Sequence, residues 1–229
     1  MLRLENLDAG YGDLTIVRGA SFEVVAGEIM AVLGHNGVGK STLLRAIMGL
    51  RRPTAGTVTF GSRSLLGLKP HEIAAEGIAY VPQEAALFPD LSVVQNLRVA
   101  FRRRSGFDEA CARALAPFPF LRERFYQRAG TLGGGEQKML LTARAPCAAE
   151  LVLIDQVTEG VQPMQERIGA ALRDLNQRYG TAMIVVEQNV AFTLGLARRF
   201  IVMKQGAIAL AGETAAPNAR SLIDEQLAL

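Results

Sequence analysis

The chain lacks most of the features that mark secreted, membrane-spanning or metal-stapled proteins. It has only two cysteines, Cys111 and Cys147, and they form no C-x-x-C pair. The sequence therefore supports neither a disulfide framework nor a zinc site. No apolar run approaches the roughly 18–20 residues that span a bilayer, and no charged n-region followed by an apolar h-region opens the chain. We expect a soluble, cytoplasmic protein.

The chain also has little excess of one sign of charge over the other. In total, 25 lysines and arginines face 22 acidic residues, which leaves a net charge of +3 and gives no indication of nucleic acid binding. The run Arg102–Arg104 follows an expected helix, where cations suit the helix dipole. We interpret this run as a solvated helix end, with a lipid or nucleic-acid patch as the alternative. Because 49% of the residues are hydrophobic, residues 1–229 can form a single globular domain.

The stretch from Gly34 to Thr42 fits G-x-x-x-x-G-K-[ST], the P-loop pattern. Residues 28–33 before it are typical of a buried strand, and residues 41–50 of a helix. In such a turn, glycines let backbone N–H groups converge on an anion, and the helix N-terminus adds its dipole. Lys40 would reach the β- and γ-phosphates, and the Ser41 hydroxyl would bind Mg²⁺. The sequence predicts a nucleoside triphosphate site formed by Gly34, His35, Asn36, Gly37, Val38, Gly39, Lys40, Ser41 and Thr42; the alternative is a chance glycine-rich loop.

Two polar side chains follow buried strands. Residues 151–155 form an apolar strand that ends in Asp155, the Walker B pattern, and this carboxylate would hold Mg²⁺ opposite Ser41. Gln83 follows the strand expected at 78–81, where α/β folds place their ligands. Gln83 is therefore a candidate site residue, although many strands end in Gln without a function.

Two further features have a structural and a functional interpretation. Tyr11 lies in Gly10-Tyr11-Gly12, which we expect to be the turn of an N-terminal hairpin. It is either an ordinary turn aromatic or a stacking platform for a base. The glycine-rich loop at 131–137 precedes a helix through Ala145, and it is either a flexible hinge or a second anion-binding helix N-terminus.

The order of elements predicts an α/β fold with a P-loop NTPase (RecA-like) core, an N-terminal antiparallel β region and an inserted α-helical subdomain. Ser92 and Gln95 resemble a capping box that opens a helix at Val93. Pro163 suits the first turn of a helix that runs to Tyr179. We expect the antiparallel region at 1–26 and 56–66, the P-loop unit at 27–55, the helical subdomain at about 90–148, and the Walker B and remaining core strands at 149–210.

The P-loop, Gln83, the Gly133–Gln137 loop and the Asp155 strand occur in the order and spacing of an ATP-binding-cassette (ABC) ATPase, and the chain resembles this family over essentially its full length. Within the family it most resembles the ATP-binding subunits of branched-chain amino acid and urea importers. The finer match is carried by residues 34–40, 80–83, 158–163 and 186–189.

The resemblance implies ATP and Mg²⁺ as cofactors and a role for each site residue. Tyr11 would stack on adenine, and Gln83 would touch the metal or the attacking water and sense transmembrane permease subunits. The signature loop would close on the γ-phosphate held by a second ABC ATPase subunit, in a homodimer or heterodimer that lies on the inner face of the plasma membrane. This loop comprises Leu132, Gly133, Gly134, Gly135, Glu136 and Gln137.

The chain departs from the family pattern at functional positions. Gln156 stands where the family has the Glu that acts as general base, and Val157 replaces the following Pro. Gly133 replaces the signature Ser, and Gln188 stands in place of a His, as is common in this subfamily. Because an amide cannot accept a proton, we expect tight ATP binding and slow hydrolysis.

Two functional hypotheses follow from these observations. The first is an ATP-binding subunit of an importer, and the second is a regulatory module that dimerises on ATP with little or no turnover. A small-molecule kinase on a P-loop fold is disfavoured, because such a kinase has no need of the Gly133–Gln137 loop.

Overall fold

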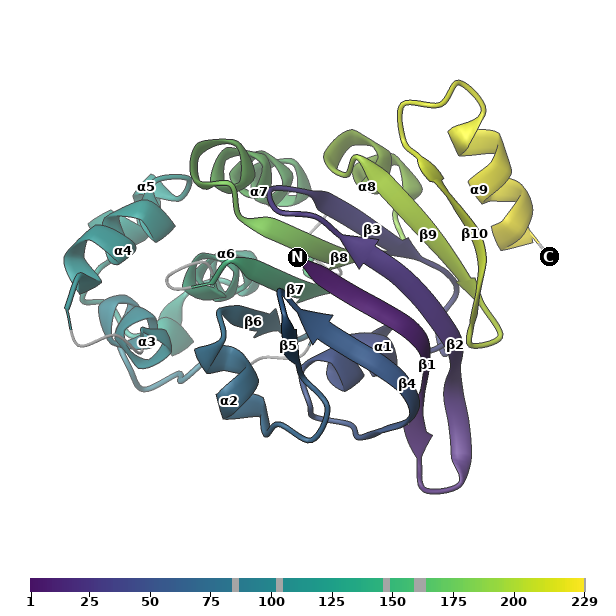
Figure 1. The fold of residues 1–229 in the computed structure, drawn as a ribbon. Coiled ribbons are helices and arrows are strands. Elements are labelled where there is room, and N and C mark those ends of the chain that lie inside the picture. The colour runs from purple at the N-terminus through teal and green to yellow at the C-terminus, as the bar shows by residue number, and fades with distance from the viewer. Residues whose placement is uncertain (84–86, 102–104, 146–148, 159–163, 229) are drawn as a thin grey trace.

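The computed structural model describes residues 1–83, 87–101, 105–145, 149–158 and 164–228. It contains an antiparallel sheet of order β2-β1-β4-β5 and a second sheet of order β10-β9-β3-β8-β7-β6, parallel except for the β9–β10 pair (Figure 1). The first sheet comprises β1 Leu2–Tyr11, β2 Leu14–Val24, β4 Pro53–Phe60 and β5 Arg63–Ser64. The second comprises β3 Ile29–Leu33, β6 Ile78–Val81, β7 Leu151–Asp155, β8 Ala182–Val186, β9 Arg199–Lys204 and β10 Ala207–Glu213.

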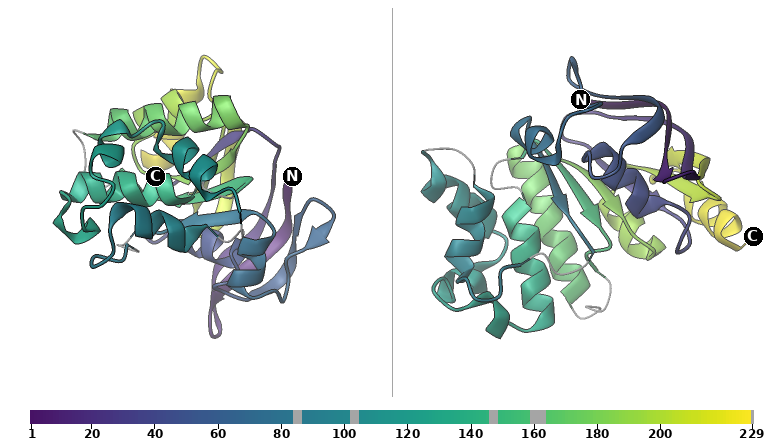
Figure 2. Two further views of the ribbon diagram at one scale, coloured as in Figure 1. Left: turned by 90° about the vertical axis from the view of Figure 1, so that its left-hand side faces the viewer. Right: turned by 90° about the horizontal axis from the view of Figure 1, so that it is seen from below.

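The parallel sheet is covered on both faces. Every residue of β3, β7 and β8 is buried, as expected for short, almost wholly apolar strands at the centre of such a sheet. One core, which includes Leu43 and Leu4, fills the space between this sheet and the antiparallel sheet. The other core, which includes Met139 and Leu172, joins the opposite face to its helices (Figure 2). The strand ends that carry polar residues are therefore fixed from both sides.

Three helices gather at one edge of the molecule and α9 lies at the opposite edge (Figure 1). The gathered helices are α3 Val93–Ala100, α4 Phe107–Leu115 and α5 Pro119–Glu123. The predicted capping box at the start of α3 is confirmed, since Gln95 Oε1 accepts from Ser92 N at 2.8 Å and Ser92 Oγ accepts from Gln95 N at 3.3 Å. The other helices are α1 Lys40–Ile47, α2 Pro70–Ala75, the 3₁₀ turn Ala129–Thr131, α6 Gly134–Arg144, α7 Gln165–Tyr179, α8 Val190–Leu196 and α9 Ala219–Ala228.

The predicted fold class and the antiparallel N-terminal region are confirmed, but three local boundaries differ. The turn expected at Gly10-Tyr11-Gly12 lies further along the chain, because β1 runs through Tyr11, which pairs with Leu14. Of the three residues, Gly12 lies in the turn, where its φ of 56° is left-handed. The strand expected at 57 begins at Pro53, the first strand position, which tolerates proline, so 53–55 leave the P-loop unit. The helix expected to reach Leu50 ends at Ile47, and Gly49 follows with a φ of 70°.

Several predicted features lie outside the described residues. They are the Arg102–Arg104 run, Cys147, Pro163 and most of the 158–163 match. Cys111 is buried and free. Over the described part of the chain, none of the helices has the length and apolar character needed to cross a membrane.

Candidate functional site

The P-loop joins β3 to α1 and wraps around the Lys40 ammonium. Lys40 Nζ donates to the carbonyl oxygens of Gly34 at 2.6 Å and His35 at 2.7 Å. Burial lowers the pKa of Lys40, and the charges of Asp155 and Glu187 oppose that shift. The turn requires glycine at its first position, because a Cβ on Gly34 would lie 2.6 Å from the carbonyl oxygen of Met203. The loop thus holds one cation at its centre, where a phosphate group would bind.

A cavity of about 220 Å³ opens beside this loop. Its lining brings Tyr11 from β1 and Gln156 from the end of β7 to the same space as the P-loop. Tyr11 is 39% exposed, its hydroxyl accepts from Arg45 Nη1 at 3.3 Å, and the Arg51 guanidinium lies 4.2 Å from its ring centroid. Hydrogen bonds with Thr42 and Arg45 lower the pKa of Tyr11. The cavity is lined by Tyr11, Ile16, Gly37, Gly39, Lys40, Ser41, Thr42 and Gln156.

The Asp155 carboxylate contacts the P-loop helix α1. Ser41 Oγ donates to Asp155 Oδ1 at 2.9 Å, and the Tyr80 hydroxyl donates to Oδ2, also at 2.9 Å. The side chain is fully buried, and burial raises the pKa of Asp155 while the two hydrogen bonds oppose that shift. Each carboxylate oxygen therefore has its own donor.

The predicted catalytic residues Gln156 and Gln188 lie together as a cluster of amides with Asn36, hereafter the amide cluster. Gln188 Nε2 donates to Asn36 Oδ1 at 2.9 Å and to Gln156 Oε1 at 3.3 Å. Gln156 is 5% exposed and has a left-handed backbone, with φ of 52°. The side-chain oxygen Oε1 of Gln156 accepts from Gln188. The side-chain nitrogen Nε2 of Gln156 offers only N–H donors.

The signature loop is not part of this cavity, since none of Leu132 to Gln137 lines it. Leu132 is buried, whereas Gly133 and Gly134 are exposed at the N-terminus of α6. Glu136 accepts from Gly133 N at 3.0 Å and forms an ion pair with Arg124 at 2.7 Å. Gln137 N donates to the Gly133 carbonyl oxygen at 2.9 Å, and Gln137 Nε2 to that of Leu132, also at 2.9 Å. The structure thus keeps this loop apart from the P-loop of its own chain.

Gln83 follows β6 by two residues and is half-buried. Of the remaining predicted site residues, His35 is exposed in the P-loop, and Val38 and Gly135 are half-buried; Asn36 of the amide cluster is also exposed.

Two site residues escaped sequence reasoning. Tyr80 contacts Asp155, and Glu187 is a buried carboxylate that accepts from Thr158 N at 3.0 Å, just beyond the amide cluster. Burial raises the pKa of Glu187, and hydrogen bonds from Thr158 oppose the shift. A signal existed for each: a tyrosine in a sheet strand needs a partner for its hydroxyl, and Glu187 directly follows an apolar strand.

The oxygen donors at Ser41 and Asp155 suit a hard cation such as Mg²⁺. Over the described residues, no group of three or more His, Cys, Asp or Glu side chains is placed to hold a metal ion. A Mg²⁺ ion here would take its remaining ligands from phosphate oxygens and water, as Mg²⁺ usually does in nucleotide sites. The residues present fit that arrangement.

We compared the sequence and the fold with those of known proteins. The sequence matches the ABC transporter family over residues 17–159. It is 35% identical to the high-affinity branched-chain amino acid transport ATP-binding protein BraG of Pseudomonas aeruginosa, over 92% of this chain and 91% of that protein. It is 29% identical to the lipopolysaccharide export system ATP-binding protein LptB of Acidithiobacillus ferridurans, over 93% of this chain and 90% of that protein.

The fold is similar to that of a nucleotide-free ATP-binding cassette from an ABC transporter. The TM-score is 0.86 at 24% identity, and the match covers 100% of this chain and 97% of that one. Membership implies ATP binding and ATP hydrolysis. On the sequence match, the fold and the P-loop site, the chain belongs to the ABC transporter family, as an ATP-binding subunit.

Proposed function

We propose that the chain binds Mg-ATP in a cassette dimer and couples slow hydrolysis to import of branched-chain amino acids or urea through separate permease subunits. The observation that carries the proposal is that Lys40 and Ser41 line the 220 Å³ cavity while Ser41 is hydrogen-bonded to Asp155. Ser41 and Asp155 would hold Mg²⁺, which would neutralise phosphate charge when bound. Lys40 would exchange its two loop carbonyls for phosphate oxygens.

Slow hydrolysis is supported by the chemistry of the amide cluster. The Gln156 amide can donate to a phosphate oxygen but cannot take a proton from the attacking water. Gln188 is also an amide, so the position at which the family commonly has a His supplies no imidazole to the site. General-base catalysis typically contributes about 10²–10⁴-fold, which sets the size of the expected loss.

A second ATP-binding subunit is supported by the position of the signature loop. Gly133 and Gly134 are exposed and do not line the cavity of their own chain, so another chain must bring such a loop to the ATP bound here. Gly133 offers no hydroxyl to the partner's γ-phosphate. In a heterodimer, the ATP site of this chain would have Gln156 and the partner's site would be closed by the Gly133 loop, so each site would have one departure. In a homodimer, both departures would occur at each site.

Permease docking is supported by a groove of about 710 Å³ between the core and the helical subdomain. Its lining is mainly apolar and includes Leu50, Ala79 and Leu141. Strand β6 forms one wall and leads directly to Gln83, so an occupant of the groove would contact the strand that positions this residue. The protein would then lie at the cytoplasmic face of the plasma membrane through its permease.

The solute is proposed from the resemblance alone. BraG is named for branched-chain amino acid transport, whereas LptB, of similar coverage, is named for lipopolysaccharide export. A direct test is uptake of labelled leucine and of labelled urea by cells that carry or lack this chain. Loss of neither uptake would remove both proposed solutes and leave the ATPase proposal standing.

The competing function is a regulatory module that dimerises on ATP without useful turnover, and the same amide cluster favours it. Single-turnover ATP hydrolysis by the purified chain, alone and with a second ATP-binding subunit and permease, separates the two. We expect a slow rate alone that rises in the complex. A rate equal to that of uncatalysed ATP in both preparations would overturn the transport-ATPase proposal.

A further inference from the structure

We propose that Tyr80 is a positioning residue that fixes the Asp155 carboxylate for Mg²⁺ and so strengthens the Mg²⁺-dependent part of ATP binding. The proposal rests on the proposed Mg-ATP site and adds a residue to it. The carrying observation is the hydrogen bond from the Tyr80 hydroxyl to Asp155 Oδ2, at 2.9 Å.

Strand pairing puts these two residues within reach of each other. Strand β6 runs parallel to β7, with Tyr80 opposite Leu153. Asp155 is two residues further along β7 and therefore points to the same face of the sheet as Leu153. An aromatic side chain is long enough to reach such a diagonal neighbour. Tyr80 and Asp155 are 75 residues apart in the sequence, and they meet because β6 and β7 are neighbouring strands.

The two donors hold Asp155 from different sides. Ser41 takes Oδ1 and Tyr80 takes Oδ2, so rotation of the carboxylate would break at least one bond. Asp155 is fully buried, and removal of the Tyr80 hydroxyl would leave Oδ2 without that donor. A buried carboxylate oxygen without a donor is costly, and the carboxylate would turn towards another donor. That rotation would move the oxygens that Asp155 offers to Mg²⁺.

Arg45 on α1 lies beside the Tyr80 hydroxyl, and hydrogen bonding with Tyr80 and Tyr11 raises the pKa of Arg45. A guanidinium has only donors, so Arg45 offers no acceptor that competes with Asp155 for the Tyr80 hydrogen. Arg45 thus supports the role assigned to Tyr80.

The alternative is that Tyr80 is an ordinary core tyrosine whose hydroxyl has found an acceptor. In that case, loss of the hydroxyl would lower the stability of the fold. Any change in ATP affinity would then be the same with and without Mg²⁺. A positioning role predicts a loss confined to Mg²⁺-containing solution. The comparison of the two conditions therefore separates the two roles.

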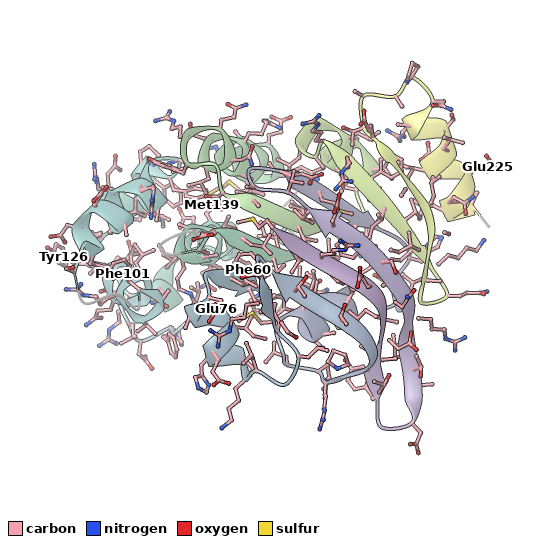
Figure 3. The ribbon with its side chains drawn as sticks, in the orientation of Figure 1. Phe60, Glu76, Phe101, Tyr126, Met139 and Glu225 are labelled. Carbon is pink, nitrogen blue, oxygen red and sulfur yellow. The ribbon has the colours of Figure 1, made fainter. Side chains whose placement is uncertain are left out.

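The test is Tyr80→Phe, which removes one oxygen and keeps the ring. ATP affinity is measured by titration in excess Mg²⁺ and in EDTA. We expect affinity in Mg²⁺ to fall about tenfold or more, as for a lost hydrogen bond to a charged group, with less than about a twofold change in EDTA. The matched control is Tyr126→Phe, because Tyr126 is 83% exposed at the outer edge of the helical subdomain (Figure 3). The control should bind ATP like the wild type in both solutions.

An equal loss in Mg²⁺ and EDTA, or no loss in either, would overturn the proposal. In an Asp155→Asn background, Tyr80→Phe should have no further effect on Mg²⁺ dependence, and a full further loss would also count against it. If Tyr80→Phe does not fold, Arg45→Lys takes its place. We expect a smaller loss of ATP affinity for this variant, in Mg²⁺ only, and unchanged ATP affinity in Mg²⁺ would overturn the proposal. Failure of the wild type to bind ATP in either solution would instead overturn the proposed ATP site itself.

Discussion

The P-loop and the segment that follows β7 lie at the same edge of one sheet, yet they differ in chemistry. On the P-loop side, Lys40, Ser41 and Asp155 supply a cation, a hydroxyl and a carboxylate, each already hydrogen-bonded. On the other side, Gln156 and Gln188 supply only amides, joined to each other at 3.3 Å. In the proposed site, charged groups would therefore surround the phosphate and the metal, whereas neutral groups would occupy the position from which water is activated.

This difference separates two tasks that an ATPase normally performs at one place. Holding Mg-ATP requires fixed charges and donors, which the P-loop side has. Removing a proton from water requires a base with a suitable pKa, and an amide has none. Changes on the P-loop side should therefore alter affinity, and changes in the amide cluster should alter turnover. The following predictions test that division, from the largest expected effect to the smallest.

Gln156→Glu should have the largest effect, an increase of about 10²–10⁴-fold in the single-turnover rate of ATP hydrolysis with little change in ATP affinity. Glu has the shape of Gln, so it fits the left-handed backbone that Gln156 already adopts, with φ of 52°. The measurement is single-turnover hydrolysis in the dimeric assembly. The control is Gln205→Glu, the same change at an exposed residue with φ of 49°. An unchanged rate for Gln156→Glu would show that the missing carboxylate is not the lesion.

Lys40→Met should have the next effect, a loss of about 100-fold or more in ATP affinity. Lys40 would donate to two phosphate groups, and hydrogen bonds to charged groups are each worth about 1.5–3 kcal/mol. Equilibrium titration with ATP measures the change, and Lys69→Met, at an exposed residue, provides a control with the same loss of charge. Unchanged affinity in Lys40→Met would contradict the assignment of the P-loop as the ATP site.

Gly133→Ser should tighten ATP-dependent dimerisation by about tenfold or more, because it would add one hydroxyl bond to the partner's γ-phosphate. The side chain has room, since a Cβ at Gly133 meets only Glu136 Oε2, at 3.7 Å. Sedimentation with and without ATP measures the dimer. Gly133→Ala adds a Cβ without a hydroxyl and should give no gain. An equal gain from both variants would assign the effect to backbone rigidity and not to the phosphate contact.

Sequence reasoning found the parts of the site that are continuous in the chain. The P-loop, its flanking strand and helix, and the apolar strand ending in Asp155 each have a local pattern, and the structure has them at those positions. A strand of four apolar residues followed by a carboxylate indicates both its burial and its site residue. For these elements local preference and final fold agree.

The contacts between separate strands could not be read from the sequence. Tyr80 meets Asp155 only because β6 pairs with β7, and Gln188 meets Gln156 only because β8 lies next to β7. No local pattern fixes the order β10-β9-β3-β8-β7-β6. The short helices α2 and α8 were missed for a related reason, since six or seven residues contain too few turns for a periodic signal.

Glu187→Gln should have the smallest effect, a change in stability and not in turnover. Glu187 lies beside the amide cluster, yet it accepts from Thr158 N and does not line the cavity, so it is not placed to act as a base. Burial raises its pKa in the folded protein, so the folded state holds the proton to higher pH than the unfolded state. Stability is thus lost as pH rises through the folded pKa, and above it the buried charge is destabilising.

Gln keeps the acceptor for Thr158 N without that charge. At pH 7.5 the Tm of Glu187→Gln should rise by roughly 2–4 °C, the shift that about 1 kcal/mol causes in a domain of this size. At about pH 3, more than one unit below the ordinary pKa of a glutamate, the wild type is protonated in both states and the difference should vanish. Glu225→Gln, at an exposed residue of α9 (Figure 3), should show no such pH-dependent difference. A drop in ATP hydrolysis in Glu187→Gln would identify Glu187 as a base that replaces Gln156 and would end the division between the two sides of the site.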